Sequence, residues 1–307
     1  MENIRPNTFS EYKGQEKAIN KMKIHVMSAK MRGTSLDHTL IYGNSGCGKS
    51  TLATVIANEM GGRLASILCP TIKKPEDMVE VLLAVQENDI LFVDEIHSLT
   101  PKTMEVLYPV LEDGKLNAEI DGERVMHDMP PFTLIAATTD LHKLSTPLRN
   151  RFPIVVELVP YKIDQMMRIV ETTCNILSLG VNDEAKETIA RCSRGVPRKA
   201  NSLVRCMRDY SIVFNDGVID ENVCEIALEE EGIDPKTGLT RQDMAYLDVL
   251  VNKYAMKSVG VDNIASAMND NKKTIETVVE PYLIQSGYVL RNARGRKATN
   301  KAFKLFH

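Results

Sequence analysis

The sequence predicts an α/β fold in its first half, a parallel sheet with helices on both faces, followed by an all-helical region and a small basic C-terminal domain. Short apolar segments at residues 39–42, 89–93 and 132–137 have the composition of buried strands, and helical patterns separate them. Strands that alternate with helices are typical of a parallel sheet covered on both faces. After Pro160 the patterns are helical, and the last 69 residues carry 11 Lys and Arg against 6 Asp and Glu.

The bulk composition is that of an ordinary globular protein with room for two or three domains. Of 307 residues, 43% are hydrophobic, none is Trp and 5% are aromatic, which argues against a surface that stacks nucleic-acid bases. The start is polar and no run of about 18 apolar residues occurs, so we expect neither a secretory signal nor a membrane span. Six scattered cysteines without a C-x-x-C pair favour a reduced, cytoplasmic protein with no zinc site.

A short insertion separates the second and third predicted strands. Leu116, Ala118 and Ile120 alternate with polar residues, and Asp121-Gly122 follows them. Alternation beside an Asp-Gly pair is a strong short-range signal for a β-hairpin. We therefore predict a hairpin near residues 115–130.

Helical patterns dominate the second half, and they suggest domain boundaries. We expect an α/β domain at residues 1–160, an all-helical domain at 161–236 and a C-terminal domain at 237–307, with a linker near residues 234–238. The C-terminal domain has the pattern of three short helices and a hairpin, with Gly287 near a turn. The predicted helices are 15–32, 51–60, one opening at Pro75, 162–179, 183–193, 197–214 and 220–230.

The strongest motif is a glycine-rich turn between the first strand and the next helix. Residues 43–50 read Gly-Asn-Ser-Gly-Cys-Gly-Lys-Ser, which matches the phosphate-binding P-loop pattern completely. Its glycines let backbone N–H groups close around phosphates at a helix N-terminus. We expect Lys49 to reach the β- and γ-phosphates of ATP and the Ser50 hydroxyl to bind Mg²⁺. The glycines of the motif are Gly43, Gly46 and Gly48, and Thr51 follows it.

An acid pair completes the predicted ATPase site. The apolar strand 89–93 ends in Asp94-Glu95. At the end of a strand beside the P-loop, Asp94 can hold Mg²⁺ and Glu95 can act as the base that polarises the attacking water. Such pairs are common and weak evidence alone, but with a P-loop they indicate ATP hydrolysis. We expect His97 to be simply a residue that follows the acids.

Several segments together resemble the AAA+ ATPases, and most closely the RuvB family of Holliday-junction branch-migration motors. The resemblance runs essentially from end to end and implies a C-terminal winged helix. It also implies that the subunits form a hexameric ring. The segments that carry it are residues 5–6, 11–15, 36–38, 94–97, 107–113, 131–139, 147–152, 194–198, 280–287 and 294–296.

The resemblance assigns roles to single residues. Thr138, or its neighbour Thr139, would contact the γ-phosphate or water, and Arg151 would be the arginine finger directed at the next subunit's ATP, with Arg149 as the alternative. Arg198 would touch ATP from the helical domain at 161–236, which would be the lid of an AAA+ ATPase whose domain is residues 1–160. The remaining nucleotide contacts implied are Arg5 and Tyr12 in the entry segment and Tyr161 at the hinge.

The basic C-terminal domain implies DNA as a partner. Arg291, Arg294 and Arg296 fall on or near the presumed wing, where they would bind phosphates without reading sequence. The alternative is a solvated basic tip. In the RuvB family the hairpin binds the junction protein RuvA, but residues 115–130 are several residues shorter than expected. Three possibilities therefore stay open: the hairpin binds RuvA, it binds a different partner, or it binds none.

Three functional hypotheses follow. The first is an ATP-dependent motor for branch migration in DNA recombination and repair. The second is a loader of clamps or helicases, whose hydrolysis would require a ring-shaped protein client. The third is a nucleotide-switched DNA-binding regulator, against which Glu95 and Arg151 argue, since a switch needs neither a water-activating acid nor a finger.

Overall fold

The computed structural model describes residues 4–120 and 123–307, which form two compact units. The first unit contains the chain up to Leu177 together with Gly195–Asn201, and the second contains Ser178–Arg194 and Ser202–His307. Within the described residues, none of the helices combines the length and apolar character that crossing a membrane requires.

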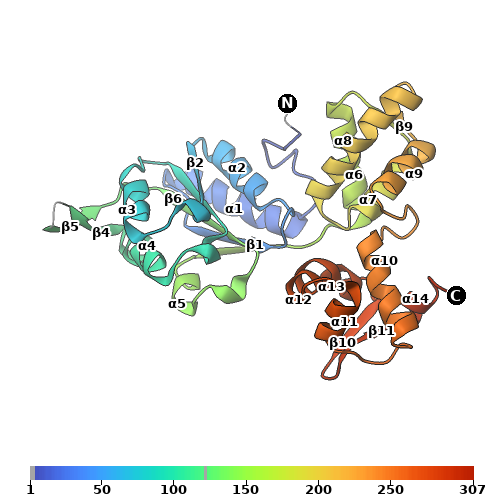
Figure 1. The fold of residues 1–307 in the computed structure, drawn as a ribbon. Coiled ribbons are helices and arrows are strands. Elements are labelled where there is room, and N and C mark those ends of the chain that lie inside the picture. Colours follow the sequence, from blue (N-terminus) through green and yellow to red (C-terminus); the bar gives the residue numbers. More distant parts are fainter. Residues whose placement is uncertain (1–3, 121–122) are drawn as a thin grey trace. The chain divides into compact units, whose positions relative to one another are not determined.

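A five-stranded parallel sheet forms the centre of the first unit (Figure 1). Its strand order is β2-β3-β6-β1-β7, which confirms the predicted fold class. The sequence patterns identified the three central strands but missed both edge strands. The strands are β1 (Thr39–Gly43), β2 (Leu64–Leu68), β3 (Ile90–Asp94), β6 (Thr133–Thr138) and β7 (Ile154–Leu158).

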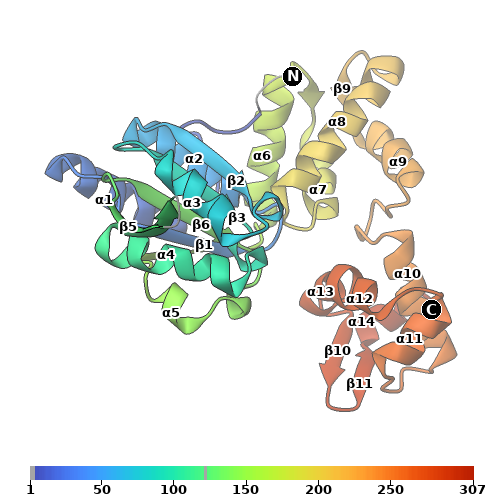
Figure 2. The same ribbon diagram turned by 60° about the vertical axis from the view of Figure 1, so that its left-hand side comes forward.

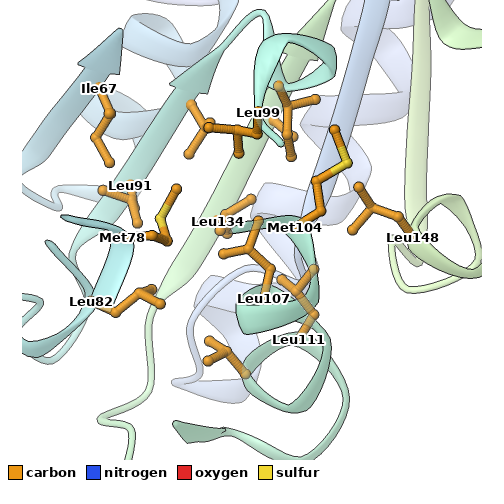
Figure 3. Packing of buried hydrophobic residues seen from close by; sticks show 14 of the residues in the cluster. Ile67, Met78, Leu82, Leu91, Leu99, Met104, Leu107, Leu111, Leu134 and Leu148 are labelled. Carbon is orange, nitrogen blue, oxygen red and sulfur yellow. The ribbon is translucent and has the colours of Figure 1, made fainter. Parts of the chain in front are cut away.

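Helices cover both faces of this sheet (Figures 1 and 2). The helices α3 (Pro75–Leu83) and α4 (Pro101–Asp113) pack on one face, where Met78 lies beside Leu91 of β3 and Leu107 belongs to the same buried cluster, near Leu134 (Figure 3). On the other side, α1 (Glu16–Arg32) and α2 (Lys49–Met60) pack on each other and on the strands. Burial of these side chains is the main stabilising contribution to the unit.

The predicted hairpin is present between α4 and β6. Strands β4 (Lys115–Ile120) and β5 (Glu123–Asp128) pair antiparallel, with Ile120 opposite Glu123. The predicted Asp121-Gly122 turn lies outside the described residues.

Four helices follow β7 and the short α5 (Thr146–Arg149), close to their predicted positions. The first unit includes α6 and the first turn of α8, and the second unit includes α7, the rest of α8, and α9. A two-residue parallel pair of strands, β8 (Gly180–Val181) and β9 (Val218–Ile219), was not predicted. The helices are α6 (Ile163–Ile176), α7 (Asp183–Cys192), α8 (Pro197–Phe214) and α9 (Glu221–Glu230).

The C-terminal region of the second unit has its own hydrophobic core, centred on Tyr246, Leu250 and Leu283. It contains more helical segments than the three expected, and its hairpin of β10 (Val289–Asn292) and β11 (Gly295–Ala298) is confirmed (Figure 2). The helical segments are α10 (Arg241–Asp248), a π-helical turn (Val249–Lys253), α11 (Val261–Met268), α12 (Lys272–Thr274), a second π-helical turn (Ile275–Val279), α13 (Glu280–Gln285) and α14 (Asn300–Phe303).

Candidate active site

The sheet order brings the predicted catalytic segments together. Strand β6 lies between β1 and β3, so the carboxyl ends of these three parallel strands are neighbours. The P-loop follows β1, the acid pair ends β3, and Thr138 ends β6. In parallel α/β sheets, ligands bind at this edge.

Lys49 begins helix α2, two residues before the predicted start of that helix. Its ammonium group is buried and donates hydrogen bonds to the carbonyl oxygens of Gly43, at 2.8 Å, and Asn44, at 3.4 Å. Burial lowers the pKa of Lys49, and the negative charges of Glu95 and Asp94 oppose that shift. A desolvated cation held by neutral carbonyls at a helix N-terminus is well suited to receive a phosphate.

A cavity of about 190 Å³ adjoins the P-loop. The Tyr12 hydroxyl donates to the Gly48 carbonyl at 3.3 Å and receives a hydrogen bond from Tyr161 at 3.4 Å. Gly48 has φ +102°, and a Cβ there would lie 2.4 Å from the Tyr12 oxygen, so glycine is required. The cavity is lined by Ile4, Arg5, Pro6, Glu11, Tyr12, Lys13, Gly48, Thr51, Tyr161, Ile169, Thr172, Thr173, Ile176, Pro197 and Asn201.

Both tyrosines of this cavity are neutral at physiological pH. Burial raises the pKa of Tyr161 to about 12. The pKa of Tyr12 is also raised, mainly by burial and to a smaller extent by the neighbouring Tyr161. The cavity therefore presents apolar side chains and neutral donors next to the phosphate-binding turn. That combination suits a nucleotide base.

Glu95 is held by the end of β6. The Thr139 backbone N–H and hydroxyl each donate to Glu95 Oε2 at 3.0 Å. Thr139 is exposed, whereas Thr138 is fully buried. Of the two threonines considered from sequence, Thr139 is thus the one that contacts the candidate base.

Thr138 acts on this site through a residue to which the sequence assigned no role. The Thr138 hydroxyl lies 2.9 Å from Nδ1 of His97, and the same ring nitrogen lies 3.2 Å from Glu95 Oε2. His97 therefore bridges the buried threonine and the candidate base. Its place two residues after Glu95 was visible in the sequence, but the contact depends on β6.

The residues predicted to bind Mg²⁺ are Ser50 and Asp94. Ser50 belongs to the first turn of α2, and Asp94 ends β3. Across the part of the chain that the structure describes, there is no group of three or more His, Cys, Asp or Glu that could hold a metal. Because Mg²⁺ is usually bound by one or two protein oxygens together with substrate phosphates, these two donors fit it.

Arg198 and Arg151 occupy different surroundings. The Arg198 backbone N–H lies 3.5 Å from the Gly46 carbonyl oxygen, so this exposed arginine of α8 adjoins the P-loop. Arg151 forms a 2.6 Å ion pair with Glu112 of α4, and its guanidinium lies 4.5 Å from the centre of the Tyr108 ring. Arg149 donates to the Thr146 hydroxyl at 3.1 Å.

Three family models cover nearly the whole chain. The Holliday junction DNA helicase RuvB P-loop domain matches residues 4–158, the RuvB AAA lid domain 161–234 and the RuvB C-terminal winged helix domain 236–307. The chain belongs to the RuvB family.

Solved structures agree with this assignment. The structure described as the Thermotoga maritima RuvB Holliday junction branch migration motor is 36% identical, covers 98% of this chain and 97% of its own, and has a TM-score of 0.86. A proline-to-glycine variant of Thermotoga maritima RuvB is 36% identical over 98% of both chains, with a TM-score of 0.87. An arginine-to-alanine variant is 35% identical, covers 98% of this chain and 97% of its own, and has a TM-score of 0.85.

The prediction that Arg296 contacts DNA is wrong, because this residue is buried in the winged helix. Arg296 is 6% exposed, and its guanidinium donates to Glu280, at 2.8 and 3.0 Å, and to Glu276, at 2.8 Å. It is an internal ion-pair residue of the domain and is not free to bind phosphate. Arg291 and Arg294, by contrast, are exposed on the β10–β11 hairpin.

Proposed function

We propose that this RuvB-family chain is an ATP-driven motor that moves the branch point of Holliday junctions. The observation that carries the proposal is a complete P-loop, whose buried Lys49 is subject to the negative charge of Glu95, in a chain that matches RuvB models throughout. A mere nucleotide switch has no need of a positioned base. The loader hypothesis is not favoured, because all three family models are those of RuvB.

The proposed reaction is attack of water on the γ-phosphorus of ATP, which breaks its bond to the β–γ bridging oxygen and releases ADP and inorganic phosphate. Glu95 accepts the proton of that water, and Thr139 and His97 hold its carboxylate in place. Lys49 stabilises the charge on the β- and γ-phosphates. Ser50 and Asp94 would hold Mg²⁺, which supplies charge neutralisation at the phosphates when bound.

The nucleotide base and the lid complete the proposed site. Tyr12, Tyr161, Arg5 and Thr51 line the cavity beside the P-loop and would hold the base and the first phosphates. Arg198 would contact ATP from the first turn of α8 and so link hydrolysis to movement of the lid. This assignment divides the chain into an ATPase domain (1–160), a lid (161–236) and a winged helix (237–307).

We also infer a closed ring, a hexamer by resemblance, in which Arg151 reaches the ATP of the neighbouring subunit. Mixing Glu95→Gln with Arg151→Ala tests this directly. Each variant alone should be inactive. In a mixed ring, however, a site with an intact Glu95 can face an intact Arg151, so about a quarter of the wild-type activity should return. A mixture that stays inactive, together with a return of activity when Glu95→Gln is mixed with Arg149→Ala, would assign the finger to Arg149.

DNA is the proposed partner of the winged helix. Arg291 and Arg294 on the exposed hairpin can bind backbone phosphates, which gives affinity without sequence preference, as a motor that moves along DNA requires. The β4–β5 hairpin would contact RuvA or a substitute protein. We place this activity in the cytoplasm.

The decisive experiment measures ATP hydrolysis and branch migration on a synthetic four-way junction, with and without RuvA, using Glu95→Gln as the inactive control. Branch migration that separates the junction into duplexes and requires ATP and Glu95 supports the motor. Dependence of this migration on RuvA supports docking through the hairpin. ATP hydrolysis without any branch migration, with or without RuvA, would contradict the motor and favour a loader.

A further inference from the structure

Arg194 has a buried side chain, which does not line the nucleotide cavity and lies outside the exposed wing. It is the last residue of one segment of the second unit, and Gly195 begins a segment of the first. Its backbone has φ +57°, a left-handed conformation that is uncommon for a residue other than glycine. Such a conformation persists where the surrounding contacts hold it.

Among the described residues, the Arg194 guanidinium has three partners, all within the second unit. Its Nε and Nη2 donate to the carbonyl oxygen of Gly238 at 3.1 and 2.7 Å, and Nη2 also forms an ion pair with Asp243. The Cζ atom lies 4.1 Å from the centre of the Tyr282 ring. The arginine side chain is 7% exposed and the Asp243 side chain 3% exposed, so solvent screens this pair little.

These partners come from three parts of the winged helix. Gly238 lies in the turn at the start of the domain. Asp243 belongs to the first turn of α10, where Oδ2 also accepts from the Thr240 N–H at 2.7 Å, and Tyr282 belongs to α13. One side chain at the end of the α7 segment therefore ties the lid to the turn and two helices of the winged helix. Arg191 Nη2 also donates to the Pro235 carbonyl at 3.3 Å, in the linker that leads to the winged helix.

The residues immediately after Arg194 are fastened to the nucleotide site of the first unit. The Tyr161 N–H donates to the Gly195 carbonyl at 2.9 Å, and a Cβ on Gly195 would lie 2.7 Å from the Tyr161 carbonyl oxygen. Gly195 has φ +71°, so glycine is required both by conformation and by space. Three residues later, the Arg198 N–H lies against the Gly46 carbonyl of the P-loop.

We propose that Arg194 is the positioning residue through which the lid carries the winged helix with it, so that nucleotide-driven movement of residues 195–198 becomes movement of DNA. A single peptide bond separates the residue fastened to the nucleotide site from the residue fastened to the DNA-binding domain. Arginine suits this role because its planar fork can pair and stack at once. The inference rests on the proposed function, since it presupposes a motor.

The role predicts a change in coupling and not in chemistry. In full-length Arg194→Gln, we expect kcat and KM for ATP and the Kd for DNA to stay within about twofold of wild type. The number of base pairs migrated per ATP hydrolysed should fall about fivefold or more, because the winged helix no longer follows the lid. Arg208→Gln is the matched control: this arginine of the same unit is 41% exposed and pairs with the adjacent Asp209, so its coupling ratio should not change.

Two further variants guard against a folding defect. Arg194→Gln combined with Asp243→Asn leaves no unpaired buried carboxylate and should still lower the ratio. Arg194→Lys keeps the charge but loses the fork and the stacking, so its ratio should lie between those of wild type and Arg194→Gln.

The inference is overturned if Arg194→Gln and the double variant migrate as many base pairs per ATP as wild type. It is also overturned if hydrolysis, DNA affinity and migration all fall in proportion, or if Arg208→Gln lowers the ratio equally. A wild-type protein that hydrolyses ATP but never moves a junction would instead contradict the proposed function. The wild-type measurement therefore distinguishes failure of the inference about Arg194 from failure of the proposed motor function.

Discussion

The P-loop and the winged helix each bury one cation, and they do so in opposite ways. Lys49 is 7% exposed and donates to two neutral carbonyl oxygens, whereas Arg296 is 6% exposed and donates to two glutamates. Burial lowers the pKa of Lys49. Burial also acts to lower the pKa of Arg296, but hydrogen bonds to Glu280 and Glu276 outweigh it and raise that pKa.

The difference separates a functional charge from a structural one. A buried cation without a direct anionic partner is costly, and an incoming phosphate relieves that cost. A buried cation with two carboxylates is already neutralised and gains nothing from a phosphate. The same isosteric change, glutamate to glutamine, should therefore affect catalysis beside Lys49 and stability beside Arg296.

The largest expected effect is that of Glu95→Gln. Glutamine keeps the shape but cannot accept the proton of the attacking water, so kcat for ATP hydrolysis should fall by about 100-fold or more. Binding of ATP, measured by calorimetry, and the unfolding temperature should stay close to wild type. An unchanged kcat would mean that Glu95 is not the base.

Lys49→Met should weaken ATP binding on the order of 100-fold, because the charge-assisted contact to the phosphates is lost. Stability should move the other way. The folded-state pKa of Lys49 lies below its unfolded value, so at neutral pH the charged form is disfavoured by folding, and its removal should leave the free protein at least as stable. Thermal unfolding with and without ATP measures both effects. A marked loss of stability without nucleotide would show that Lys49 has a structural role like that of Arg296.

The parts of the site that the sequence predicted are local in the chain. The P-loop and the Asp94-Glu95 pair each lie within one strand-to-helix or strand-to-loop connection, so spacing alone predicted them. The central strands were equally plain, because both of their faces are buried and their sequences are continuously apolar. The edge strand β2 is only half-buried and lacks that pattern.

The missed features depend on neighbours that are distant in sequence. His97 gains its role because β6 places Thr138 2.9 Å away, and Thr139 contacts Glu95 across 44 residues. In sequence, Arg296 looked like its exposed neighbours Arg291 and Arg294. Side chains alternate between the two faces of a strand, but this alternation does not show which face the rest of the domain covers. Charge counting predicted a basic domain but not which cations reach solvent.

Glu280→Gln tests the structural half of the comparison. It removes the charge of the carboxylate that accepts two of the hydrogen bonds of Arg296 and leaves that of Glu276, and the Tyr246 hydroxyl, which donates to Glu280 at 3.0 Å, loses a charged acceptor. We expect the winged helix to lose about 3 kcal/mol of unfolding free energy, measured by denaturant titration, with ATP hydrolysis unchanged. As a control, Glu276→Gln should cost less, since Glu276 is more exposed and shares one contact with Arg296. Equal losses of unfolding free energy in Glu280→Gln and Glu276→Gln would show that the two glutamates stabilise Arg296 equally.

The smallest expected effects belong to the exposed arginines of the hairpin. Arg291→Ala and Arg294→Ala should each weaken duplex DNA binding a few-fold at about 0.1 M salt and lower the slope of log K against log salt concentration by about one, because each removes one phosphate contact. Both variants should fold normally, since these side chains are solvent-exposed. Fluorescence anisotropy over a salt series measures the slope. If Arg296→Met lowered the slope as much as Arg294→Ala while the domain stayed folded, the buried cation would bind DNA after all, and the distinction drawn between Lys49 and Arg296 would fail.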